Sequence, residues 1–536
     1  MDRIYYNGTI LTMRCASAAE ELRQSPHAVL VRDGLIAAVG DLNELPAKPD
    51  AEYCDLRGRC LLPGFIDPHS HFVANGQMAL RADLSDCGSF DDIVRTLRSY
   101  HEINAGQNVI IGFGYDHNFL KEGRHPDRHV LDMVSTELPV CIQHVSLHFA
   151  CVNSAALNAA GLDAGTPDPE GGKFGRLENG ELSGYLEEKA TGSVSKALNL
   201  SVSEYSPGMI EGMQEAYLRY GITTVQEGSA NTGKLALLDK LAEAGALKPD
   251  VVAYATFTNT EAELPQRYPQ YAKNYRNHVR IGGYKIFLDG SPQGRSAWMS
   301  RPYLGGDPGY CGYPRITDEQ VQRRIETALS ERRQILAHCN GDAASEQFIT
   351  AYERAIQATG VTDDLRPVMV HCQTVRNDQL DRMRAIRMIA SIFVGHVWYW
   401  GDVHVKNFGE ERGSRISPAK DAIERGLHVN FHQDTPVTKP NMLHSVWCAV
   451  NRLSRGGNVI GEDQKISVYD ALRAVTVEGA YEYFEEREKG TIEVGKRADL
   501  VILDKSPLDV PEIGIKDIKV CETIKDGVTV YKNPSC

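Results

Sequence analysis

The chain has 536 residues, a formal net charge of −13 at pH 7, 42% hydrophobic residues and 24% charged residues. These proportions are typical of globular proteins and argue against a disordered or membrane-embedded chain. The acidic balance, without a cluster of lysines and arginines, argues against a nucleic-acid partner. Because the length exceeds one small core, we expect several units, or one barrel with additions, acting on a small molecule.

The N-terminal stretch and the cysteines bear on the compartment. Residues 1–10 lack a basic segment followed by an apolar core, so no secretory signal is expected. No window approaches the ~18 apolar residues of a membrane span. The 12 cysteines include no Cys-x-x-Cys pair, which predicts reduced thiols rather than a disulfide framework. Together these features predict a cytoplasmic protein that does not associate with membranes.

Both ends of the chain are rich in β patterns. Four stretches have strand-like composition: residues 4–12, 28–39, 498–503 and 523–531. Asp-Gly pairs at Asp33-Gly34 and Asp526-Gly527 favour tight hairpins in the second and fourth stretches. Short strands alone are unstable, so residues 1–60 and 488–536 are predicted to meet in one composite β-sandwich.

The middle of the chain alternates strand-like and helix-like segments. Apolar runs begin at Val109, Val140, Thr223, Val251, Gly282, Ile335, Val368, Ile389 and His428. Amphipathic helices are expected between several of them, for example over residues 318–331 and 418–425. Repeated β/α units predict an α/β fold with a (β/α)₈ TIM-type barrel over residues 61–487. Residues from about 80 to 205 are predicted to be inserted after the first barrel strand.

An apolar run over residues 61–72 ends in two histidines, His69 and His71. On a strand, this i, i+2 spacing would place both imidazoles on one face. Imidazole is the commonest protein ligand for zinc and related metals, and a usable site needs further donors from elsewhere. The run therefore predicts half of a metal site at the end of barrel strand one.

Further donors occur at or near the ends of later apolar runs, where a barrel places its functional residues. They are Lys285, His338, His371 and Asp434. Taken singly, each has an ordinary explanation, such as a surface or core histidine, a turn-forming aspartate or an edge-strand lysine. Their occurrence in order after His-x-His is what indicates a site.

This order of residues resembles the amidohydrolase superfamily, and more narrowly its YtcJ-like branch, which includes N-substituted formamide deformylase. The resemblance spans essentially the whole chain and rests on residues 62–71, 111–116, 148, 153–157, 221–225, 285–291, 338–342, 371–373, 434–437 and 490–501. The chain departs from the branch at Met369-Val370, where a short acidic lead-in is usual. It also departs at His432-Gln433, where a small residue usually precedes the aspartate.

The resemblance implies one or two divalent metal ions. The implied ligands are His69, His71, Lys285, His338, His371 and Asp434. Imidazole and carboxylate donors without thiolate favour Zn²⁺, with Fe²⁺ or Mn²⁺ as alternatives. Lys285 would ligate as a carboxylated lysine, because an apolar strand lowers the lysine pKa and exposes the neutral amine to CO₂. A mononuclear centre with unmodified Lys285 is the alternative.

The implied reaction is hydrolysis of a C–N, amide-type bond by a metal-activated hydroxide. Asp434 would move protons, while the second metal, or His371 and His148 as nearby donors, would polarise the substrate carbonyl. Expected substrate contacts are Asp116, His148, Asp289, His396 and Trp398, although the aromatic segment suits packing equally well. If it faces the pocket, a hydrophobic amide such as an N-substituted formamide is the natural substrate.

Two other functions stay open. The same centre could hydrolyse a cyclic imide, an ester or a lactone, or deaminate its substrate. A different class is a binding or regulatory protein without turnover, against which the intact set of ligands argues. A homodimer is left open as the state of association.

Overall fold

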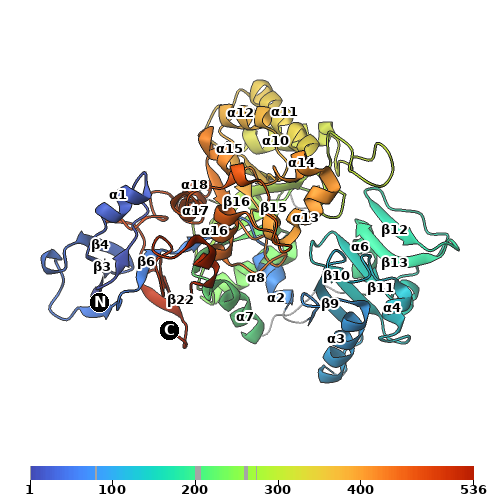
Figure 1. The fold of residues 1–536 in the computed structure, drawn as a ribbon, viewed down its shortest axis with the longest axis horizontal. Helices are drawn as coiled ribbons and strands as arrows, with labels where there is room; N and C mark the ends of the chain where they lie inside the picture. Colours follow the sequence, from blue (N-terminus) through green and yellow to red (C-terminus); the bar gives the residue numbers. More distant parts are fainter. Residues whose placement is uncertain (1, 79–80, 105, 199–206, 259–262, 273) are drawn as a thin grey trace. The chain divides into compact units, whose positions relative to one another are not determined.

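The computed structural model describes residues 2–78, 81–104, 106–198, 207–258, 263–272 and 274–536. The chain forms two compact units (Figure 1). The first consists of Met1–Phe72, Gln214–Thr435 and Lys439–Cys536, and the second of Val73–Met213 and Pro436–Thr438. Among the helices in the described ranges, none combines the length and apolarity needed to cross a membrane.

An eight-stranded sheet, parallel throughout, forms the body of the first unit. Its strands in spatial order are β20 (Val429–Phe431), β19 (Ile389–Ile392), β18 (Val368–His371), β17 (Gln334–Cys339), β16 (Val279–Phe287), β15 (Asp250–Thr256), β14 (Ile222–Ala230) and β7 (Phe65–Ile66). Spatial order follows chain order, as repeated β/α units require. The predicted succession of parallel β/α units is confirmed.

Helices follow most of these strands and cover the sheet. Those of the first unit are α1 (Ala18–Arg23), α8 (Thr232–Glu243), α9 (Leu264–Arg267), α10 (Asp318–Ser330), α11 (Asp342–Thr359), α12 (Asn377–Ala385), α13 (His396–Phe408), α14 (Glu410–Gly413), α15 (Ala419–Glu424), α16 (Met442–Asn451), α17 (Val468–Ala474) and α18 (Val477–Glu482). Helix α10 begins with a capping box, in which the side chains of Thr317 and Gln320 accept each other's backbone N–H. Strands β17, β18 and β19 are buried at every position, as expected for a sheet covered on both faces.

The first and last strands of this sheet are joined beyond their ends. Within the described ranges, β7 and β20 form no strand pairing. Instead, the Asp434 N–H donates to the His69 carbonyl at 3.2 Å, and the His71 N–H donates to the Thr435 carbonyl at 2.7 Å. The curled parallel sheet is thus observed, whereas closure into a full barrel stays a prediction.

The predicted first barrel strand is split in two. Cys60–Pro63 (β6) pairs antiparallel with β21 (Leu500–Leu503) in another sheet, and only β7 continues in the parallel sheet. His69 lies in the bend after β7 and His71 forms an isolated β-bridge with Glu227, so the two histidines do not lie on one extended strand and the predicted reason for their alignment is wrong. Pro68 has no N–H to donate to a ladder, which explains why the strand ends before them.

Two small sheets are built from the ends of the chain. One has the order β4-β3-β1-β5 and the other β2-β6-β21-β22-β23. The strands not yet given are β1 (Asp2–Tyr6), β2 (Thr9–Ile10), β3 (Ala28–Arg32), β4 (Leu35–Gly40), β5 (Glu52–Asp55), β22 (Val520–Lys525) and β23 (Val528–Lys532). Both predicted Asp-Gly hairpins form, as β3–β4 and β22–β23. Figure 1 shows the blue strand β6 beside red strands from the other end of the chain.

A single apolar cluster joins these two sheets. It includes Tyr5 and Val29 from one sheet and Leu61, Leu500 and Ile524 from the other. All five side chains are buried, so each sheet shields the apolar face of the other from water. The sandwich architecture, with residues 1–60 and 488–536 as its bounds, stays a prediction.

The second unit contains a six-stranded sheet of order β12-β13-β11-β10-β9-β8. Its strands are β8 (Ala82–Asp83), β9 (Ile110–Tyr115), β10 (Val140–His144), β11 (Phe149–Val152), β12 (Gly172–Arg176) and β13 (Leu182–Glu188), and its helices are α3 (Phe90–Ile103), α4 (Arg128–Asp132), α5 (Ser154–Ala159) and α6 (Ala190–Ala197). Helices α2 (Phe72–Met78) and α7 (Pro207–Leu218) lead into and out of it. The apolar runs at Val109 and Val140 therefore belong to this sheet and not to the parallel one. Residues 80, 105 and 199–205 of the predicted insertion lie outside the described ranges.

One pair of cysteines departs from the predicted reduced state. Cys521 in β22 and Cys536 form a disulfide across a sequence separation of 15, with their Cα atoms 5.4 Å apart. The chain returns along β22 after the hairpin, where the Asn533 N–H donates to the Cys521 carbonyl at 2.8 Å. Because these two cysteines are far apart in the sequence and form no Cys-x-x-Cys pair, the sequence does not predict this disulfide. The other ten cysteines are free thiols.

Candidate metal centre

The predicted metal ligands gather at the carboxyl ends of the parallel strands. Lys285 lies in β16, His338 in β17 and His371 at the last position of β18, while His69 and His71 follow β7 and Asp434 follows β20. Parallel strands bring these ends to one edge of the sheet, which is where α/β folds place their functional residues. Residues far apart in the sequence therefore meet because the strands are parallel and in register.

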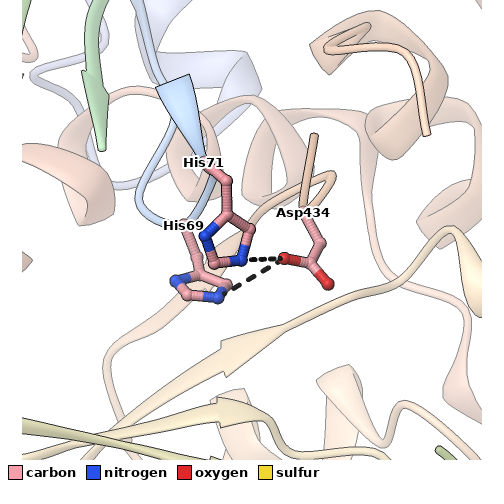
Figure 2. A group of neighbouring side chains, drawn as sticks. All are labelled: His69, His71 and Asp434. Carbon is pink, nitrogen blue, oxygen red and sulfur yellow. Dashed lines mark ion pairs between the residues drawn. The ribbon is translucent and has the colours of Figure 1, made fainter. Parts of the chain in front are cut away.

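His69, His71 and Asp434 form the most compact group. Asp434 Oδ1 lies 3.4 Å from His69 Nε2 and 3.3 Å from His71 Nε2. Figure 2 shows both imidazoles turned toward this one carboxylate oxygen. Ligand atoms of a tetrahedral zinc site, each about 2.0–2.2 Å from the ion, lie roughly 3.3–3.6 Å apart. Asp434 Oδ1 is buried and makes no hydrogen bond in the described structure, so the group has the spacing and the available donor that a metal requires.

The orientation of His69 is fixed from behind. Its Nδ1 donates to Gln226 Oε1 at 2.6 Å, which leaves the Nε2 lone pair facing Asp434. Gln226 is itself held, because its side-chain N–H groups donate to the Pro68 carbonyl and to Tyr483 Oη. Burial lowers the pKa of His69 well below its usual value. A neutral, oriented imidazole is the form in which histidine binds metals.

Lys285 is completely buried. Its Nζ lies 3.4 Å from His69 Nε2 and 5.3 Å from the centre of the Phe287 ring. Burial lowers the pKa of Lys285 to about 7. The direction is the one expected from its apolar strand, and it makes a large fraction of the amine neutral near pH 7.

His338 and His371 form a second pair. Their rings meet edge to face, with centres 4.5 Å apart, and the His371 ring lies 5.6 Å from that of His69. Burial lowers the pKa of His371 well below its usual value, so this imidazole is also neutral. His371 has a positive φ of 75°, an uncommon backbone conformation for a non-glycine residue and one often found at functional sites.

Asp289 lies next to His338, and its predicted contact with substrate stays a prediction. Its Oδ1 is 3.1 Å from His338 Nδ1 and also accepts the Asn340 N–H at 3.0 Å. Its Oδ2 accepts the N–H groups of Gly341 and Trp298 at 2.7 and 3.0 Å. The carboxylate is fully buried, so the structure makes it a residue that orients His338.

Replacing Asp289 with asparagine should weaken metal binding about 10- to 100-fold, the usual effect of losing a carboxylate that orients a histidine ligand. The Zn²⁺ affinity, measured by competition with a chelating dye, checks this. Asp307→Asn, in an exposed segment of the same unit, is the matched control and should bind as the wild type does. Equal affinities for Asp289→Asn and the control would show that Asp289 does not orient the ligand.

His396 and Trp398, also predicted to contact substrate, lie on helix α13. His396 is buried, and its Nδ1 lies 3.0 Å from His404 Nε2. Trp398 packs edge to face on Trp447, with ring centres 5.2 Å apart. Both residues thus have packing partners within the first unit, and a role in binding substrate stays a prediction.

Asp116 and His148 belong to the second unit. His148 Nδ1 lies 2.8 Å from Glu188 Oε1. Asp116 Oδ1 lies 3.4 Å from His144 Nε2 and 3.8 Å from His117 Nδ1, and these two nitrogens are 3.2 Å apart. His117 and His144 are not among the site residues predicted from the sequence. Their signal was present, because Asp116 and His117 follow β9 and His144 ends the neighbouring parallel strand β10.

His432 is a further residue that the predicted ligand set leaves out. It lies directly after β20, two residues before Asp434, and is fully buried. Its ring centre is 5.1 Å from those of both His69 and His371. The signal in the sequence was the departure from the branch pattern at this position.

Comparison with known proteins agrees with this geometry. Residues 52–531 match the amidohydrolase family. The chain is 27% identical to YtcJ of Bacillus subtilis over 554 residues, covering 99% of this chain and 100% of YtcJ. It is 27% identical to N-substituted formamide deformylase of Arthrobacter pascens, covering 94% and 95% of the two chains.

Among solved structures, the crystal structure of an uncharacterized metal-dependent hydrolase from Pyrococcus horikoshii is similar. It superposes with a TM-score of 0.74 at 26% identity, covering 96% of this chain and 99% of that one. The resemblance inferred from the motifs is thereby confirmed over nearly the full length. The chain belongs to the amidohydrolase family and is a metal-binding hydrolase.

Proposed function

We propose that the protein hydrolyses C–N bonds of the amide type at a divalent metal centre, with Zn²⁺ as the metal. The observation that carries this proposal is the convergence of His69 Nε2 and His71 Nε2 on one oxygen of Asp434. Family membership and the similarity to a formamide deformylase support it.

The donor set fits such a metal. Neutral imidazoles and a carboxylate suit zinc-type ions better than hard or thiolate-bound ones. His69, His71 and Asp434 would hold one ion, and His338 and His371 a second, with carboxylated Lys285 between them. When bound, the metal supplies an acidified water and polarises the carbonyl that is attacked.

The chain's own residues supply proton transfer. Asp434 has a positive φ of 53°, and its N–H is held by the His69 carbonyl, so its carboxylate is fixed against the two imidazoles. From this position it would accept a proton from water and deliver it to the leaving amine. In the mononuclear alternative His371, neutral and buried, holds no second ion and would donate a hydrogen bond to the developing oxyanion.

Removing the metal tests the centre as a whole. Dialysis against a chelator should abolish hydrolysis and lower the thermal unfolding temperature, because bound metal stabilises the folded state. Adding back Zn²⁺ should restore both. Full activity in protein with less than one metal per hundred chains would contradict the proposal and favour a metal-independent protein or a contaminating enzyme.

Carboxylation of Lys285 can be tested through pH. Because the pKa of Lys285 is about 7, the amine is mostly protonated at pH 6 and mostly neutral at pH 8. Only the neutral amine reacts with CO₂, so bicarbonate should add the mass of one CO₂ in native mass spectrometry at pH 8 and much less at pH 6. Lys285→Arg is the control and should gain nothing. An unmodified wild-type mass at pH 8 would favour the mononuclear alternative.

For the substrate, we propose a hydrophobic amide, with an aromatic N-substituted formamide as the first compound to test. The aromatic residues of α13 near Phe393 support this, since the Phe393 ring lies 4.7 Å from that of His396 and 5.2 Å from that of His432. A panel at fixed metal should show amine release from this compound ahead of a cyclic imide, an ester, a lactone and an aminopurine. Faster turnover of one of the others would assign the alternative reaction.

The finer features of the fold are part of the same proposal. We propose that the parallel sheet closes between β7 and β20 into a TIM-type barrel and that the two terminal sheets form a sandwich. The two backbone hydrogen bonds between the segments after β7 and β20 support closure. The shared cluster around Leu61 and Leu500 supports the sandwich.

A further inference from the structure

His432 is a fully buried imidazole whose two ring nitrogens lack well-formed hydrogen bonds to the residues that the structure describes. Neither ring nitrogen makes a hydrogen bond of normal geometry with any described residue, although the ring approaches the backbone of Ser391. A buried polar group left unpaired costs about 1–3 kcal/mol, so native proteins nearly always supply a partner. The position of the ring therefore needs an explanation other than packing.

A second buried histidine shows what a structural role looks like in this protein. His396 is equally removed from solvent, and its Nδ1 lies 3.0 Å from His404 Nε2. The two rings stack with an interplanar angle of 7°. Here the protein provides the partner for an imidazole in its core. It provides none of comparable geometry for His432 among the described residues.

The place of the His432 ring relative to the predicted ligands indicates the partner. Its centre lies 5.1 Å from His69 and 5.1 Å from His371, and the two motif histidines, His69 and His71, are 5.3 Å apart. Two imidazoles bound to one tetrahedral ion, each with a metal–nitrogen distance of about 2.0–2.1 Å, have ring centres roughly 5 Å apart. The ring of His432 is therefore as far from the rings of His69 and His371 as the rings of His69 and His71 are from each other, to within 0.2 Å.

The backbone keeps the ring in this place. The His432 N–H donates to the Ile392 carbonyl at 3.3 Å, which extends the pairing of β20 with β19 by one residue. The Phe393 ring lies on another side of His432, with centres 5.2 Å apart. The side chain is thus supported by the strand and by an aromatic ring, and the imidazoles of His69 and His371 are also among its neighbours.

We propose that His432 is an additional imidazole ligand of the metal centre, between the group that contains His69 and the pair that contains His371. This inference rests on the proposed metal centre and adds a donor to it. An extra neutral nitrogen strengthens the preference for zinc-type ions over Mg²⁺ or Ca²⁺, which bind oxygen. It also raises the number of imidazoles at the centre above the four that the family resemblance implies.

The test compares metal binding by the full-length wild type, His432→Phe and His432→Gln, with Zn²⁺ and Co²⁺ as probes. His432→Phe keeps a ring of similar size in the apolar site, and His432→Gln keeps a polar group should the phenylalanine variant fail to fold. We expect each variant to bind Zn²⁺ at least about 10-fold more weakly, by analogy with changes next to metal ligands. X-ray absorption should count fewer imidazoles per metal, and the Co²⁺ absorption bands should shift.

Controls separate this inference from the proposed centre. His428→Phe, at an exposed histidine directly before β20, should leave affinity and imidazole count unchanged, and His71→Ala should reduce both. If the wild type binds no metal, the centre itself fails and the inference fails with it. If His71→Ala loses metal while both His432 variants keep wild-type affinity and imidazole count, the centre stands and His432 is not a ligand.

Discussion

Replacing Asp434 with asparagine is expected to leave metal bound and to lower kcat by roughly 10²- to 10⁴-fold, the usual worth of a general acid–base group. Asparagine keeps the size of the side chain and one oxygen for His69 and His71, but it cannot accept a proton from water. Steady-state kinetics with metal analysis of the same preparation measures both quantities.

The outcome that contradicts this role is full turnover with metal still bound. Loss of metal together with activity would show instead that Asp434 acts chiefly as a ligand. Asp307→Asn serves as the control for the chemical change alone and should keep wild-type kinetics, because Asp307 is exposed.

Replacing Lys489 with methionine is expected to lower the free energy of unfolding by about 3–5 kcal/mol, the usual effect of removing one partner from a buried charge pair. Lys489 Nζ lies 2.6 Å from Asp250 Oδ2 and 2.7 Å from Glu485 Oε2, and the lysine is almost wholly buried. Lys525 also pairs with Asp250, at 3.0 Å, and Arg280 pairs with Glu485, at 2.8 Å, but the variant would leave these two buried acids and Asp499 with one cation fewer.

The loss of unfolding free energy in Lys489→Met should become smaller as the pH falls. Burial alone would raise the pKa of Asp250, but the attraction of Lys489 and Lys525 outweighs it and holds that pKa well below its usual value. The stability that Asp250 contributes is therefore complete above pH ~4 and is lost as the pH falls below it. Urea unfolding from pH 7 to pH 3 should show the difference between wild type and variant shrinking in acid.

A matched lysine on the surface provides the control. Lys465 pairs with exposed Glu462 at 3.1 Å, and pairs of this kind are worth about 0–1 kcal/mol. Lys465→Met should therefore change the free energy of unfolding by no more than this amount. A loss from Lys489→Met no greater than that from Lys465→Met would mean that the buried network does not stabilise the fold.

The sequence predicts the parts of this protein that depend on local pattern. The Asp33-Gly34 and Asp526-Gly527 hairpins form where the turn chemistry places them. The ends of apolar runs predict where His338 and His371 lie, because a strand end is visible as a change from apolar to polar residues. The order of ligands also predicts the family.

The sequence does not predict the features that depend on contacts between neighbouring strands. Asp289 orients His338 only because β16 and β17 are neighbours, and nothing in either run marks that pairing. His69 and His71 converge on Asp434 after β7 has ended, and not from one face of a strand. Their spacing therefore marks the site for a physical reason other than the predicted strand geometry. The runs at Val109 and Val140 look like the others and differ only in the sheet they join.

The antiparallel pairing of β6 with β21 has a consequence for how the protein is made. Strands β1 to β6 leave the ribosome early, and β6 can pair at once with β2, but β21, its partner on the other side, is translated only after the whole parallel sheet. During most of translation these early strands carry an unpaired edge, which is the kind of surface that promotes aggregation and recruits chaperones. The ends of the chain therefore join as a late step of folding, and a ribosome that stops before β21 releases a chain in which β2 and β6 lack the other three strands of their sheet, although β1, β3, β4 and β5 can still pair.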